Sequence, residues 1–189
     1  MAEFILTGII IVLLCVYAKE IRALGIKGLT EIAIFIALAS VGRAICVFIP
    51  SFQPASFFII CCGIFLGGGA GLICGVGVAL VSSLMTSVGP WTIWQLFLWG
   101  MMGLGAGFVG GRRLWVKVLY GFLWGYFFGW VINLWWFTTG AVPFNAGTYL
   151  LSCASSFWHD SIHAVCNASL IYVFFVFKKR IVFLDRYKD

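Results

Sequence analysis

Charge is what this sequence lacks most. Only 10% of its 189 residues are Asp, Glu, Lys or Arg, whereas 63% are hydrophobic. A soluble domain of this length has too little interior to bury so many apolar side chains, which excludes that class. Apolar runs that cross a bilayer must satisfy their backbone hydrogen bonds internally, as helices do. We therefore expect an all-α integral membrane protein.

Catalytic and energy-coupling signatures are missing too. The chain has no Walker A loop, no pair of catalytic carboxylates, no haem signature and no GxSxG motif. Its two halves do not repeat each other, as those of many secondary transporters do. We expect a protein that is not an enzyme. If it transports a solute, it depends on ATP hydrolysis by partners or on a gradient.

Apolar runs separated by glycine, proline and polar residues predict seven helices. They lie at residues 2–18, 29–49, 55–66, 69–87, 91–110, 114–137 and 149–177. The third is short, and the glycines at 67–69 join it to the fourth as a helical hairpin. We expect an extra N-terminal span with a cytoplasmic linker over residues 1–28, and a membrane bundle over residues 29–189.

The basic residues predict the orientation in the membrane. Three clusters of Lys and Arg lie in alternate connections: Lys19, Arg22 and Lys27; Arg112, Arg113 and Lys117; Lys178, Lys179, Arg180, Arg186 and Lys188. If all three are cytoplasmic, the opposite loops contain no Lys or Arg. The N-terminus is then outside and the C-terminus inside. This explains the net charge of +6 without a nucleic-acid partner.

Polar residues recur along the last predicted helix at steps of three and four, which places them on one face. They are Ser152, Ser156, His159, Asp160, His163 and Asn167. Such a face can hydrogen-bond to other helices, line a ligand pocket, or hold a metal through His159 and His163. Because the HxxxH spacing is a weak signal on its own, we assign no metal and no intrinsic cofactor.

Arg43 is a basic residue inside a predicted span. It lies roughly 9 Å below the outer end of its helix, at about 1.5 Å per residue. We expect a structural ion pair between Arg43 and Asp160, which would neutralise both charges and join the second span to the seventh. Two alternatives are an Arg43 side chain that reaches outward to water and one that binds an anionic ligand group.

Aromatic and amide residues gather in the outer third. The fifth span begins with Trp91, Trp94 and Gln95, the sixth ends with Asn133, Trp135 and Trp136, and two outer loops contain Gln53 and Asn145. Single Trp residues at this depth often form an interfacial belt. Their combination with amides in several spans favours a pocket with flat apolar walls and a few hydrogen-bonding groups.

Small residues form three further surfaces. Two have four-residue spacing, Ala33 and Ala37 in the second span and Gly67, Gly71 and Gly75 at the fourth. The third is a series of glycines in the fifth span: Gly100, Gly103, Gly105, Gly107, Gly110 and Gly111. This spacing lets helix backbones approach closely. Each surface can pack within the chain or contact another membrane protein.

Several segments, taken together, resemble a known family. Residues 29–110 contain LTEIAIFIALASVGRA, FIPSFQP, GGGAGLICG and GPWTIWQLFLWGMMGLGAG in that order. Their order and spacing resemble the substrate-binding S-components of energy-coupling factor (ECF) vitamin importers. The combination VGR, FQP and GPWTIWQ, with the extra N-terminal span, is most similar to the cobalamin (vitamin B12) S-components.

That resemblance implies a six-helix core bundle in the bacterial plasma membrane that captures a vitamin from outside. It implies docking on a transmembrane coupling protein (T-component) with two ABC ATPases, which bind ATP and Mg²⁺, and toppling of the S-component to deliver its ligand. Ala33 and Ala37 match the alanine motif that contacts the coupling protein. Val41 interrupts the small-residue run one step later.

The resemblance also suggests roles for the outer residues. Phe52, Trp91, Trp94 and Trp136 would form apolar walls, and Gln53, Gln95, Asn133 and Asn145 would hydrogen-bond the amides of a corrinoid. His159 and Asp160 would approach the ligand from below. The alternatives are an S-component for pantothenate or a flavin, a membrane enzyme using His159, Asp160 and His163, and a structural subunit of a larger complex.

Overall fold

The computed structural model describes residues 2–140 and 142–185, with side chains as far as Lys178. Those residues form helices and connections and no strand. The elements are α1 (Ala2–Ala23), α2 (Gly25–Ile45), the 3₁₀ turn η1 (Cys46–Phe48), α3 (Pro54–Leu66), α4 (Gly68–Met85), α5 (Trp91–Val109), α6 (Leu114–Ile132), α7 (Trp135–Thr138) and α8 (Ala146–Asp185). Within the described chain, six helices are long and apolar enough to span a membrane, and α3 is a shorter apolar helix. The protein is therefore a multi-pass, all-α membrane protein, as predicted.

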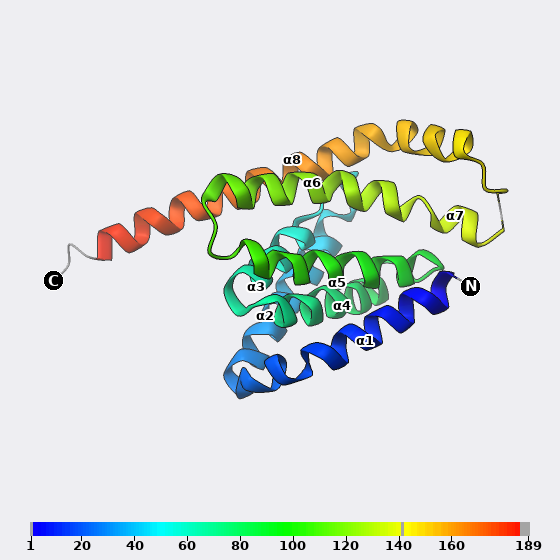
Figure 1. Cartoon of the computed structure of the whole chain (residues 1–189). Helices are drawn as coiled ribbons and strands as arrows, with labels where there is room; N and C mark the ends of the chain where they lie inside the picture. The colour runs from blue at the N-terminus through cyan, green and yellow to red at the C-terminus, as the bar shows by residue number, and fades with distance from the viewer. Residues whose placement is uncertain (1, 141, 186–189) are drawn as a thin grey trace.

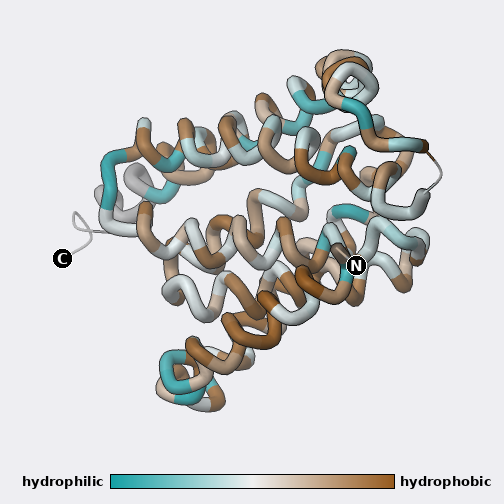
Figure 2. The backbone as a smooth tube through the Cα atoms, turned by 45° about the vertical axis from the view of Figure 1, so that its right-hand side comes forward, coloured by the Kyte–Doolittle hydropathy of each residue, from teal (hydrophilic) through white to brown (hydrophobic). Residues whose placement is uncertain are grey.

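The helices form two groups (Figure 1). In the larger group α4 and α5 pack along each other, α2 and α3 lie against them, and α1 lies on α4 and α5. In the smaller group α6 packs along α8. The groups meet through α5 with α6, and through α3 with α8 and α6. Hydrophilic segments concentrate at the connections, and the middles of the helices are hydrophobic (Figure 2).

Close glycine contacts hold each group together. A Cβ added at Gly71 of α4 would collide with the backbone of Gly103 in α5, and one at Gly125 of α6 with the backbone of Ala164 in α8. Only glycine allows backbones to approach so closely. The glycines predicted in the fourth and fifth spans therefore pack within the chain. Ala33 and Ala37, in contrast, are exposed on α2.

Helix boundaries differ from the prediction where polar residues are expected to end a helix. The expected cytoplasmic linker is largely helical, because α1 continues to Ala23 and α2 begins at Gly25. Lys, Glu and Arg are good helix formers, so charge alone does not end a helix. Gly25 has a φ of 62°, a left-handed conformation that glycine adopts without strain. The turn between the helices is therefore confined to about this residue.

A carboxylate joins α1 to α4. Glu20 Oε1 accepts a hydrogen bond from the backbone N–H of Gly69 at 3.1 Å. Gly69 lies in the first turn of α4, where backbone N–H groups have no partner within the helix and negative charge is favourable. Gly67, the residue before α4, has a φ of 97°, a positive value that glycine adopts readily and that lets the chain turn between α3 and α4. The extra N-terminal helix is thus attached to the bundle at this end.

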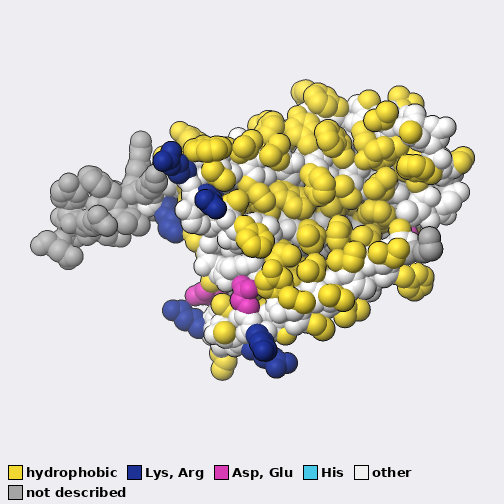
Figure 3. Space-filling model, in the orientation of Figure 1, with side chains coloured by type: hydrophobic (Ala, Val, Ile, Leu, Met, Phe, Trp, Pro, Cys, Tyr) yellow, Lys and Arg dark blue, Asp and Glu magenta, His cyan; other side chains and the backbone are white. Residues whose placement is uncertain are grey.

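The basic side chains visible in Figure 3 gather at one end of the molecule, the end of the α1–α2 connection and of the C-terminus. Lys19, Arg22, Arg113 and Lys178 are exposed there. Lys117 differs, since it is 7% exposed and its Nζ donates to the backbone oxygen of Arg112. The described basic residues of the three clusters thus share one end, as the predicted topology requires, and Lys179, Arg180, Arg186 and Lys188 lie outside the residues whose side chains are described.

Candidate ligand-binding site

A polar pocket lies between the end of α2, the loop before α3 and the residues that follow α4. Its volume is about 180 Å³. It is lined by Arg43, Cys46, Val47, Ile49, Ser51, Phe52, Gln53, Thr86 and Ser87. The basic clusters lie at the other ends of α2 and α4: from Lys27 to Arg43 the helix rises roughly 24 Å, at about 1.5 Å per residue.

Local sequence explains the loop that forms one wall. α2 ends in the short turn η1, and Pro54 opens α3 at a position where its missing N–H costs nothing. Between them, Ser51 has a φ of 58°, the one positive value among the described residues other than glycine. Such a conformation is unusual for serine and marks a tightly constrained loop. The loop places Phe52 and Gln53 at the pocket.

Arg43 turns inward beside this pocket. Its Nη1 donates to Ser82 Oγ at 2.6 Å, and its Cζ lies 4.9 Å from the centre of the Trp99 ring. Ser82 Oγ in turn donates to the backbone oxygen of Val78 at 2.6 Å. Cation–ring contacts of this kind stabilise a partly desolvated guanidinium.

The expected ion pair between Arg43 and Asp160 is not formed in the described structure. Asp160 is 6% exposed, accepts a hydrogen bond from Ser156 Oγ at 2.9 Å and lies against Gly129 of α6. The two charged residues therefore have separate partners. The physical reason is the helix arrangement, because α2 packs on α3 and α4 and α8 packs on α6.

Three of the six residues on the polar face of α8, namely Ser156, His163 and Asn167, form hydrogen bonds to other helices. Ser56 Oγ and His163 Nε2 are 2.8 Å apart, which joins α3 to α8. Asn133 Nδ2 donates to Ser156 Oγ at 3.0 Å, and Asn167 Nδ2 donates to the backbone oxygen of Gly121 at 3.1 Å. These contacts support the packing interpretation for His163 and Asn167.

His159 and His163 have different environments. His159 is exposed, whereas His163 is 3% exposed, and its ring centre lies 5.4 Å from that of Phe128 with the two rings nearly perpendicular. Among the described residues, no group of three or more His, Cys, Asp or Glu is placed to hold a metal ion.

The predicted aromatic and amide residues fall into separate groups. Gln95 accepts a hydrogen bond from Ser83 at 3.3 Å inside the α4–α5 packing. Trp91 packs edge-on against Trp135, which stacks on Trp136 with ring centres 3.9 Å apart. Asn145 is exposed and accepts from the backbone N–H of Gly147 at 2.7 Å, in the first turn of α8.

The structure thus brings Phe52 and Gln53 together at one pocket, with Arg43 beside them. Within the described structure, Gln53 Oε1 and the Trp94 indole N–H are buried without a hydrogen-bond partner. Buried polar atoms without partners are rare in native structures and mark positions where another group can bind. Trp91, Trp136, Asn133, Asn145 and His159 do not line this pocket.

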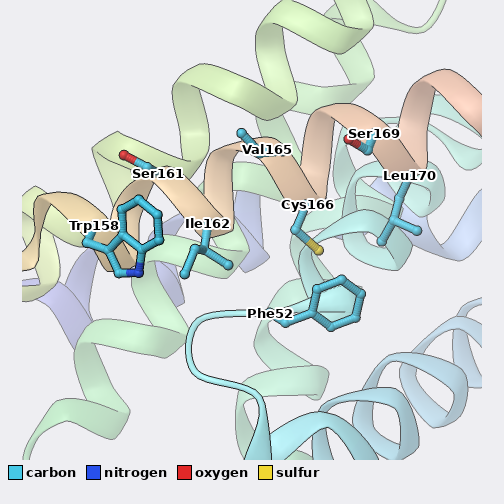
Figure 4. A pocket seen from close by; sticks show the side chains of 8 residues that line it. All are labelled: Phe52, Trp158, Ser161, Ile162, Val165, Cys166, Ser169 and Leu170. Atoms are coloured by element: carbon cyan, nitrogen blue, oxygen red, sulfur yellow. The ribbon is translucent and has the colours of Figure 1, made fainter.

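An apolar pocket of about 380 Å³ lies on the other side of Phe52, along α8 (Figure 4). Ile162, Cys166 and Leu170 point from α8 toward Phe52 in this view, and Trp158 lies farther along the same helix. Its volume falls within the range of about 300–1,000 Å³ that is usual for small-molecule sites. Phe52 therefore borders both a polar and an apolar pocket.

Sequence reasoning missed three serines and one glycine series. Ser56, Ser82 and Ser83 make contacts between helices, and each was visible as a hydroxyl in an otherwise apolar span. Gly121, Gly125 and Gly129 lie against α8. Their four-residue spacing was a readable signal of close helix packing.

Comparison with known proteins identified no relative: no protein-family model, no curated protein and no solved structure matches this chain. The fold and the pocket define a class, a multi-pass helical membrane protein with a polar pocket at the end opposite its basic clusters.

Proposed function

We propose that this protein is the membrane-embedded, substrate-binding subunit of an ECF-type vitamin importer. It binds its vitamin from outside and delivers it inward when docked on a coupling protein with two ABC ATPases. The observation that carries this proposal is the pocket beside Arg43, which joins a half-buried cation, an unpartnered Gln53 oxygen and the Phe52 ring. A pocket with apolar walls and a few convergent polar groups is typical of small-molecule sites.

The α2 surface supports docking on a membrane partner. Ala33 and Ala37 are exposed, and so are Ile34, Leu38 and Val41 around them. Two alanines one turn apart leave a shallow strip between larger apolar side chains, into which a partner helix can pack closely. In the importer family that this sequence resembles, the matching alanines contact the coupling protein.

Cobalamin is the first ligand to test, because the sequence resembles cobalamin S-components most. A corrinoid is far larger than a pocket of about 180 Å³. On this proposal it lies across the outer surface, and only one of its polar substituents enters the pocket. Pantothenate, the smaller alternative, would leave less of itself outside the pocket.

Binding to the purified full-length chain tests the proposal. Cyanocobalamin, pantothenate and riboflavin are titrated in detergent without ATP, and stoichiometric binding of one of them is expected. Gln53→Ala should weaken that binding by about tenfold, the loss of a typical net hydrogen bond. The control is Thr30→Ala, which removes an exposed hydroxyl near the start of α2, at the end opposite the pocket, and should leave binding unchanged.

Uptake gives the second test. Expression of this chain with a coupling module should restore growth of a cobalamin auxotroph on limiting cobalamin. If no vitamin binds and no uptake appears, the proposal is wrong. Chemical turnover of a substrate by the isolated chain would instead favour the membrane-enzyme alternative.

A further inference from the structure

Arg43 has no counter-charge in the described structure. The acidic side chains described are Glu3, Glu20, Glu31 and Asp160, and none of them forms an ion pair with Arg43. Glu20 binds the start of α4, and Asp160 binds Ser156. Arg43 is therefore held by a hydroxyl and an aromatic ring alone.

Most of the hydrogen-bonding capacity of Arg43 is unused. A guanidinium presents five N–H donors in a planar fork, and the hydrogen bond to Ser82 uses one of them. A cation partly withdrawn from water costs free energy unless an opposite charge or several hydrogen bonds compensate it. Because Arg43 lines the polar pocket, its remaining donors are available to an occupant of that pocket.

The rest of the lining suits an anion that brings hydrogen-bonding oxygens. Ser51, Thr86 and Ser87 supply hydroxyl groups, and Gln53 supplies an amide. Hydroxyls and an amide N–H₂ can donate to the oxygens of a carboxylate or phosphate, whereas a guanidinium binds such groups through two parallel hydrogen bonds. A volume of about 180 Å³ admits such a group with a few attached atoms.

We propose that Arg43 binds an anionic group of the transported ligand, a carboxylate or a phosphate ester, and so selects anionic over neutral vitamins. This inference rests on the proposed function and names the chemistry of its ligand. The phosphodiester of cobalamin and the carboxylate of pantothenate both meet the requirement. Riboflavin, which has neither group, does not.

Matched ligand pairs test this inference. Pantothenate is compared with pantothenol, in which an alcohol replaces the carboxylate, and cyanocobalamin with cobinamide, which lacks the nucleotide loop that contains the phosphodiester. Dissociation constants are measured in detergent free of phospholipid, so that lipid headgroups do not compete. The wild-type protein should bind the anionic member at least about 30-fold tighter, the usual loss when a desolvated charge loses its partner.

Two variants separate charge from structure. In Arg43→Gln the preference for pantothenate over pantothenol should fall to about onefold and that for cyanocobalamin over cobinamide should decrease, while the affinity for pantothenol or cobinamide stays within about threefold. Arg43→Lys should retain part of the preference, because lysine keeps the charge without the bidentate geometry. Arg113→Gln, which removes an exposed cation at the other end of the molecule, should change nothing.

The possible results distinguish a failure of this inference from a failure of the proposed function. If wild-type protein binds pantothenol or cobinamide as tightly as its anionic counterpart, or if Arg43→Gln keeps the preference, this inference is wrong and the proposed function stands. If no vitamin binds, the proposed function fails, and titration with acetate and phosphate decides the inference through the total tryptophan fluorescence, to which Trp99 beneath Arg43 contributes. Saturable quenching in wild type and not in Arg43→Gln supports it, and no difference overturns it.

Discussion

Replacing both Ala33 and Ala37 by leucine should abolish transport and leave ligand binding intact. Both alanines are exposed on α2, so the larger side chains meet detergent or lipid in the isolated subunit. Substitutions at such positions usually change the free energy of unfolding by less than about 0.5 kcal/mol. The pocket is more than one helical turn away from either residue, and its lining does not include them.

The expected loss in docking can be estimated from packing. Inserting extra methylene groups into a close-packed contact costs about 1–3 kcal/mol for each substitution. Two leucines on adjacent turns therefore weaken docking by about 2–6 kcal/mol, which is roughly 30-fold to 10⁴-fold in affinity. At working concentrations of the coupling module, that loss should stop ATP-driven uptake.

The assay uses proteoliposomes that contain this subunit and its coupling module. ATP-dependent uptake is measured together with ATP-independent binding of the same vitamin. Ala154→Leu, an exposed position on α8, is the matched control and should keep both. Ala39→Leu, a fully buried position on the same helix, should destabilise the fold. Uptake by the double variant within about threefold of wild type would refute the docking role of this surface.

Four further predictions concern stability and are measured by thermal unfolding in detergent. Glu20→Gln should lose about 0.3–1 kcal/mol, because it removes a negative charge from the first turn of α4, and an unchanged melting temperature would contradict this. Ser56→Ala should cost about 1–3 kcal/mol by leaving the buried His163 ring nitrogen unpaired, and adding His163→Phe should recover most of the loss. Gly125→Val should destabilise by at least about 1–3 kcal/mol, because its side chain collides with α8. Gly8→Ala, with nothing within 4 Å, should instead stabilise by about 0.5–1 kcal/mol.

The number and positions of the helices could be predicted from sequence because apolar runs and glycine breaks are local signals. Six of the seven predicted segments match a long apolar helix, and the short segment matches α3. Two helix ends differ from the prediction: the first helix continues beyond residue 18 to Ala23, and α6 ends at Ile132 before residue 137. The charged and aromatic residues at these places neither require nor prevent a helix. The sixth span is interrupted after Ile132, and the short helix α7 follows from Trp135.

The contacts between helices could be predicted only in part. Arg43 and Asp160 were paired because both are charged and lie at similar depths. Depth does not tell which helices are neighbours, and α2 and α8 belong to different groups. The partners that the structure gives, Ser82 and Ser156, are neutral hydroxyls. Of the predicted site residues, Phe52 and Gln53 line the pocket because a single loop positions both.

The length of α8 has a consequence for how the protein sits in its bilayer. Its apolar part, Ala146–Lys178, has 33 residues, or about 50 Å of helix against a hydrocarbon core of about 30 Å. An upright α8 would expose about 20 Å of apolar helix, so hydrophobic mismatch favours an inclined one. Because glycines hold α6 tightly on α8, the two helices incline together. If the proposed function holds, bilayer thickness can influence the tilt of the subunit, and lipid composition can influence delivery without any change in the pocket.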